Sequence, residues 1–107
     1  MLPFVTQLRT PAEAIQLAPA GAVSITIRVQ LLEAWDAVKV VAEPHTTVAE
    51  VKARALFVLA PDVPQPGDVV VKLGGFEIRD EAQSLASAGV RDGATLLLHF
   101  RRRQPVK

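Results

Sequence analysis

The residue types that most often bind metals or act in catalysis are few in this chain and lie far apart in the sequence. There are two histidines, His45 and His99, and no cysteine. A metal site needs three or four ligands brought together, and neither histidine has a partner ligand at a recognisable spacing. We therefore expect no metal site, and nothing in the sequence predicts a cofactor.

The remaining polar residues do not form a catalytic set either. No serine lies in the strand-to-helix turn that activates a nucleophile. Acidic residues such as Asp80 and Asp92 lie among turn residues, where carboxylates usually cap turns. Gly74 and Gly75 are not followed by the lysine-bearing helix start of a phosphate-binding loop. We expect neither an enzyme nor a small-molecule substrate.

The composition is typical of one soluble domain. The chain has 107 residues, half of them apolar, and a formal net charge of +1. Because the charges balance, only a local basic cluster could attract nucleic acid, and Arg101 to Arg103 is too short a run for that. Neither a signal peptide nor a membrane-inserting segment is recognisable. We expect a cytoplasmic protein, consistent with the absence of cysteine.

Alternating apolar and polar residues predict a β-sheet protein with one helix. A strand is expected from Val23 to Gln30, and a second one around Val38 to Ala42 completes a hairpin. Thr47 and Glu50 form a capping box at the start of a predicted helix. Its expected apolar positions are Val48, Val51, Ala55, Val58 and Leu59, and its expected solvent-facing positions are Glu50, Lys52 and Arg54. Further strands are predicted at 69–73, 76–79 and 94–102.

Residues 1–22 differ from the rest because prolines interrupt them at short intervals. Prolines spaced in this way prevent a long helix or strand. We expect a flexible N-terminal extension. The alternative is a segment that becomes ordered on a partner through its apolar residues, which are Leu2, Phe4, Val5 and Leu8.

Residues 23–103 resemble ubiquitin and the ubiquitin-like β-grasp domains. The matching landmarks, in chain order, are Glu43-Pro44, Thr47-Val48, Val51-Lys52-Ala53, Gly75, Ile78, Asp80, Ser84-Leu85, Val90 and Thr95-Leu96-Leu97-Leu98. The resemblance implies an α+β fold in which a mixed sheet of four or five strands packs on one α-helix. Residues 104–107 are then a C-terminal tail.

The end of the chain departs from the ubiquitin pattern. Ubiquitin is conjugated through a C-terminal diglycine, whereas residues 101–107 read Arg-Arg-Arg-Gln-Pro-Val-Lys. Gly74-Gly75 is no substitute, because cleavage there would remove the last predicted strand. We expect a ubiquitin-like protein that is not conjugated by the usual chemistry.

The docking face departs as well. In ubiquitin this face is an apolar patch, and the aligned positions here are Lys72, Leu97 and His99. Arg28 and Arg101 are expected to point the same way by the period of two. A basic face with one apolar centre suits an acidic protein partner. The alternative is a sheet face that is simply solvated.

The tip of the first hairpin is a second candidate surface. Leu31, Leu32 and Trp35 cannot easily all point inward from a short turn, and tryptophan is enriched at binding hot spots. The alternative is that Trp35 lies flat over the edge of its own sheet.

We therefore expect a ubiquitin-like interaction module that docks non-covalently on a larger partner. Similar proteins without a diglycine accompany bacterial type VII secretion, and the alanine-, valine- and arginine-rich composition suits a GC-rich bacterium, so a bacterial secretion or regulatory assembly is one possible context. The alternative is a covalently conjugated modifier with an atypical C-terminus such as Lys107. The chain could also be a fragment of a longer protein. A monomer is favoured, and the oligomeric state stays open.

Overall fold

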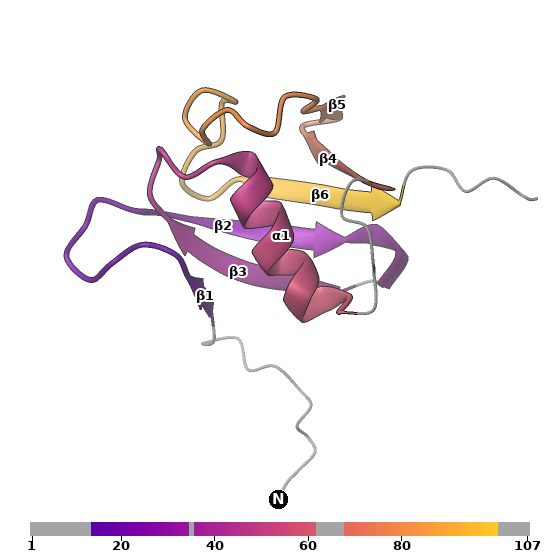
Figure 1. Ribbon diagram of the computed structural model, residues 1–107, viewed down its shortest axis with the longest axis horizontal. Helices are drawn as coiled ribbons and strands as arrows, with labels where there is room; N and C mark the ends of the chain where they lie inside the picture. The colour runs from indigo at the N-terminus through magenta and orange to yellow at the C-terminus, as the bar shows by residue number, and fades with distance from the viewer. Residues whose placement is uncertain (1–13, 35, 62–67, 101–107) are drawn as a thin grey trace, which may run out of the picture.

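The computed structural model describes residues 14–34, 36–61 and 68–100, which form a sheet with one helix across it (Figure 1). The strands lie in the order β1-β3-β2-β6-β4-β5. The elements are β1 (Ala14–Gln16), β2 (Ile25–Leu31), the 3-10 turn η1 (Leu32–Ala34), β3 (Asp36–Ala42), α1 (Val48–Leu59), β4 (Val69–Leu73), β5 (Phe76–Glu77) and β6 (Thr95–Phe100). The expected hairpin, helix and later strands are all present.

The hairpin of β2 and β3 sets the two faces of the sheet. The strands pair antiparallel from Ile25 opposite Ala42 to Leu31 opposite Asp36. Alternate side chains of β2 are buried against the helix, and the residues between them point to the opposite face. The period of two in the sequence therefore predicted correctly which side chains share a face.

The last strand, β6, lies in the middle of the sheet, as Figure 1 shows. It pairs parallel with β2 and antiparallel with β4. Parallel neighbours need a crossover connection, and the segment that contains α1 provides it. This central position gives β6 a neighbour on both sides, so its side chains occupy the middle of each face.

The helix begins where the capping signal predicted it. Thr47 Oγ1 accepts a hydrogen bond from the Glu50 amide at 3.1 Å, as expected of an N-cap. The loop before β6 satisfies two further amides, because Val48 N donates to Gln83 O and Ala49 N donates to Glu81 O. The start of α1 is thus tied to a distant loop. Within the described ranges, no helix is long and apolar enough to cross a membrane.

The buried face of the helix differs at two positions from the one predicted. Val58 was expected in the core, but it is 38% exposed, and Leu56 is buried in its place. Lys52 was expected in solvent, yet it is 4% exposed. Both follow from the helical repeat, because the buried stripe through Val48, Lys52 and Leu56 advances four residues at a time. Lys52 was expected in solvent because of its charge, although its position in the helical repeat places it on this stripe.

The buried Lys52 forms an ion pair with a carboxylate from the loop before β6. Its Nζ lies 3.0 Å from both Glu81 Oε1 and Glu81 Oε2. The Glu81 side chain keeps 26% of its surface exposed, whereas that of Lys52 keeps 5%. A buried ammonium group requires such a partner. The pair therefore holds α1 against the same loop that caps its first turn.

The sheet contains a strand that the sequence analysis did not predict. β1 pairs parallel with β3, with Ala14 opposite Lys39 and Gln16 opposite Val41, and so brings the sheet to six strands instead of four or five. Ile15 and Leu17 pack against the core as partly buried residues. The sheet therefore starts inside the segment that was expected to be an extension. Residues 1–13 and 101–107 lie outside the described residues.

Candidate functional site

The candidate site is the face of the sheet opposite the helix. Arg28, Leu97 and Lys72 reach this face from β2, β6 and β4, because the residues on either side of them in each strand turn to the other face. The register then sets them in rows: Leu97 lies directly opposite both Gln30 and Lys72. We call this surface the open face.

The most unusual feature of the open face is a pair of cations in direct register. Arg28 of β2 lies opposite Lys39 of β3, and both side chains are exposed. Arg28 N donates to Ala94 O on β6, so its amide points away from β3. The two residues therefore form a non-hydrogen-bonded pair, the closer kind, with Cα atoms about 4.5 Å apart. Among the residues that the structure describes, neither cation makes an ion pair.

Such a pair costs stability in the free protein. Like charges directly opposite each other on a sheet are destabilising, by roughly 0.2 to 1 kcal/mol. Thr95 lies on the other side of Arg28 and adds a hydroxyl group to the same row. The arrangement can receive an anionic group between the two cations. Sequence reasoning had found Arg28 but missed Lys39, because only the hairpin register shows that they are neighbours.

Beyond this pair, the open face continues with one apolar residue, Leu97, and one further basic residue, Lys72. Leu97 is half-buried beside Lys72, and Glu77 of β5 lies on the far side of Lys72. With strands about 4.8 Å apart and about 3.3 Å per residue, the Cα atoms of Arg28 and Lys72 lie roughly 12 Å apart with Leu97 between them. The positive charge is therefore strongest over β2 and β3 and falls off toward β5.

No protein-family model matches this sequence, and no curated protein matches it either. Solved structures do match. A ubiquitin-like domain of an Arabidopsis thaliana protein superposes with a TM-score of 0.63 at 14% identity, covering 84% of this chain and 90% of that chain. The ubiquitin of Caldiarchaeum subterraneum gives 0.61 at 20% identity, covering 78% of this chain and all of that chain. The fold is a ubiquitin-like β-grasp. A designed protein based on ubiquitin gives 0.62 at 24% identity, with 81% of this chain and all of that chain covered.

These identities show the fold alone. They confirm the expected α+β class, a mixed sheet on one helix. The ubiquitin-like domain here has six strands where four or five were expected, and the unpredicted strand β1 lies beside β3.

His99 contributes to the open face less than the sequence analysis expected. It lies opposite Val70, which is only 5% exposed, so this end of the face is largely closed. His99 Nδ1 lies 3.2 Å from the Phe100 carbonyl oxygen, and its Nε2 is buried without a hydrogen-bond partner in the described part of the chain. A buried Nε2 cannot bond to a partner that approaches the face. The usable part of the open face is thus the remainder, which runs from Lys39 on β3 across β2 and β6 to Lys72 on β4.

The second candidate surface, at the hairpin tip, loses one of its members. Leu31 is 1% exposed and belongs to the core, because β2 extends to it and pairs it with Leu98. The expectation that Leu31 contacts a partner was therefore wrong. Leu32 follows in η1 and is 41% exposed, as expected. Trp35 and Arg101 lie outside the described residues.

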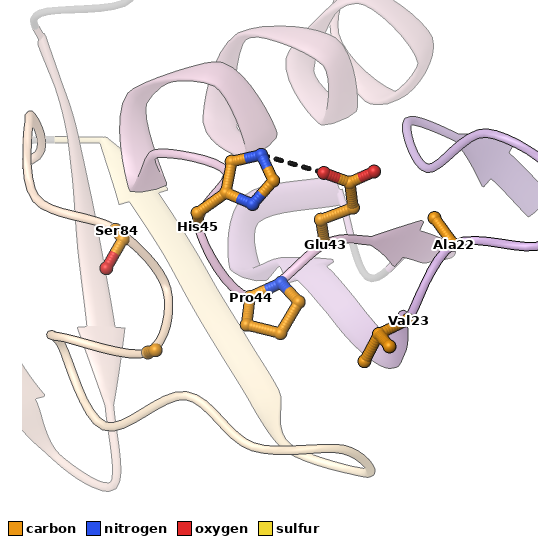
Figure 2. A pocket seen from close by; sticks show the side chains of 7 residues that line it. Ala22, Val23, Glu43, Pro44, His45 and Ser84 are labelled. Carbon is orange, nitrogen blue, oxygen red and sulfur yellow. Dashed lines mark ion pairs between the residues drawn. The ribbon is translucent and has the colours of Figure 1, made fainter.

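A hollow of about 470 Å³ is lined by Glu43, His45, Ser84 and their neighbours, and by none of the residues of the open face named above (Figure 2). His45 Nε2 lies 2.7 Å from Glu43 Oε1 at its rim. Ser84 Oγ accepts a hydrogen bond from the Ser87 amide, and Figure 2 shows its hydroxyl turned away from the His45 ring. Within the described ranges, no three histidine or acidic side chains lie close enough to hold a metal. The hollow therefore offers no catalytic set.

Proposed function

We propose that this ubiquitin-like domain is a protein interaction module that docks non-covalently on a larger partner through the open face. The partner carries acidic side chains on both sides of an apolar one. The carboxylates meet the Arg28–Lys39 pair and Lys72, and the apolar side chain covers Leu97. A partner in a bacterial secretion or regulatory assembly fits the composition of the chain.

One observation carries this proposal. Arg28 and Lys39 are placed so that they repel each other, and no acid of the described residues offsets that repulsion. A surface that serves only solubility gains nothing from two cations in direct register, whereas such a pair can bind one acidic group from both sides. Residues that destabilise the free fold are often those that bind.

The test uses a charge reversal that does not weaken the fold. In Arg28→Glu, the new carboxylate lies opposite Lys39, so repulsion becomes attraction and the free protein is at least as stable as the wild type. Partners are captured from the native host with the wild-type chain, identified by cross-linking mass spectrometry, and titrated against both proteins. We expect a loss of affinity of about tenfold or more, which corresponds to about 1.4 kcal/mol, and an attraction that weakens as salt rises.

Arg54→Glu is the matched control, because Arg54 is an exposed arginine on α1, in the other layer. Its affinity for the partner stays unchanged. If Arg28→Glu binds as the wild type does, the open face is only solvated and the proposal fails. Blots of denatured lysates test the covalent alternative, since a ladder of heavier species would show conjugation in place of docking.

A further inference from the structure

The β1 strand occupies the edge of β3 in a way that resembles a ligand in a binding site. Its backbone is bound beyond the strand itself, since Leu17 N and Ala18 N both donate to Val41 O, at 2.8 and 3.2 Å. The backbone carbonyl group of Val41 points outward to β1. The backbone amide and carbonyl groups of Lys39 and Ala37 therefore point outward as well, because alternate residues of a strand direct these groups to the same side. The edge of β3 thus offers a row of backbone groups to an added strand.

The rest of this edge is already closed by the chain itself. The Ala37 amide donates to the carboxylate of Asp36 at 2.9 Å. A side chain that takes up an edge amide blocks the addition of a strand at that point. The available stretch is therefore short and runs from Lys39 to Val41, the three residues that β1 pairs with.

The core does not depend on β1. All the residues of the buried cluster come from the other elements, and Ile15 and Leu17 only pack against it as partly buried residues. β1 contributes three residues to the sheet, whereas β2 and β3 contribute seven each. An element with few hydrogen bonds to its neighbours and little buried surface opens at a lower free energy than the rest of the fold. We therefore expect β1 to open at a lower free energy than β2 and β3.

We propose that the edge of β3 from Lys39 to Val41 is a second docking site, which accepts an extended segment of a partner protein in exchange for β1. The segment enters parallel to β3 and carries the pattern aliphatic, polar, aliphatic, as Ile15-Gln16-Leu17 does. The inference does not rest on the function proposed for the open face. In the free protein β1 occupies this site. A partner segment must therefore bind the edge of β3 more favourably than β1 does.

The connection between β1 and β2 makes β1 a strong competitor for the edge of β3. It runs from residue 17 to residue 24, and Gly21 within it adopts a φ of 85°. A short connection of this kind keeps the tethered strand at an effective concentration that is roughly millimolar. A free segment therefore binds the unaltered chain weakly, and binding strengthens when β1 is loosened.

The experiment uses the full chain and a labelled peptide with the sequence of residues 11–20. In Ile15→Asp, a charge replaces the aliphatic side chain that packs against the core, and β1 detaches. We expect the peptide to bind this variant roughly tenfold or more tighter than the wild type. In NMR spectra, we expect the chemical-shift changes on addition of the peptide to occur at residues 39–41. Gln16→Asp is the matched control, because Gln16 is exposed in the same strand, and it binds the peptide as the wild type does.

Two results would overturn the proposal. One is equal affinity of the peptide for the wild type and Ile15→Asp, and the other is a set of shifts away from β3. If Ile15→Asp does not fold, hydrogen exchange of the unaltered chain decides the matter. We expect the Leu17 and Ala18 amides to exchange at least about 100-fold faster than those of Val29 and Leu98. Equal rates would mean that β1 opens only with the whole fold, and the edge would not be a docking site.

Discussion

Removing the carboxylate of Glu81 should destabilise the protein far more than removing the ammonium group of Lys52. Lys52 is 4% exposed, and in Glu81→Gln its ammonium group loses both charge-assisted hydrogen bonds of 3.0 Å. Breaking a buried pair in this way costs about 3 to 5 kcal/mol when both partners are fully buried. Since 26% of the Glu81 side chain is exposed, water reaches this side of the pair, and we expect about 2 to 3 kcal/mol.

The converse change leaves a group that water can stabilise. In Lys52→Met, a side chain of similar length fills the same space, and the remaining carboxylate of Glu81 is hydrated through its exposed surface. Because the charge that remains is hydrated and not buried, the loss resembles that of an exposed ion pair, about 0 to 1 kcal/mol. The two variants remove the same ion pair but differ in which charge stays behind.

Urea unfolding followed by far-ultraviolet circular dichroism measures both free energies, with the slope checked for two-state behaviour. For a chain of this size, 2 to 3 kcal/mol corresponds to a drop in Tm of roughly 10 to 20 °C. Glu50→Gln is the control, because Glu50 is an exposed carboxylate in the first turn of α1, and it changes stability by about 0.5 kcal/mol. Equal losses for Glu81→Gln and Lys52→Met would refute the argument from burial.

Three further changes test the description of the fold. Leu31→Ala should cost about 2 to 5 kcal/mol, whereas Leu32→Ala should cost less than about 1 kcal/mol, because only Leu31 is buried; similar losses in urea unfolding would contradict this assignment. Thr47→Ala should cost about 1 kcal/mol through loss of the N-cap, and Thr47→Ser should restore most of it in thermal melts. Glu33→Ala should cost about 1 kcal/mol, since Glu33 Oε2 accepts the Phe100 amide at 3.1 Å; unchanged hydrogen exchange at that amide would show that the bond does not form in solution.

The two proposed docking sites meet at Lys39. Its side chain belongs to the open face beside Arg28, and its backbone belongs to the edge that β1 covers. The tests separate the sites, because a side-chain charge governs binding at the first and the backbone of β3 governs binding at the second. Arg28→Glu should leave binding of the β1 peptide intact, and Ile15→Asp should leave the charge of the open face intact.

The local order of the elements could be predicted from the sequence because it depends on neighbouring residues. Alternation in β2 and β3 sets which side chains share a face, and Thr47 sets where α1 begins. The period of two predicted that Arg28 would lie on the open face, whereas Leu97 and Lys72 were expected there from the resemblance to ubiquitin.

The burial of Lys52, the register of Arg28 with Lys39, and the strand β1 required the tertiary structure. Lys52 can be buried only because Glu81, distant in the sequence, lies within 3.0 Å of it. Arg28 and Lys39 become neighbours only through the hairpin register. β1 has too few residues to show a period, and it is a strand because β3 offers it an edge. Each of these features depends on contacts between residues far apart in the chain, which no local pattern encodes.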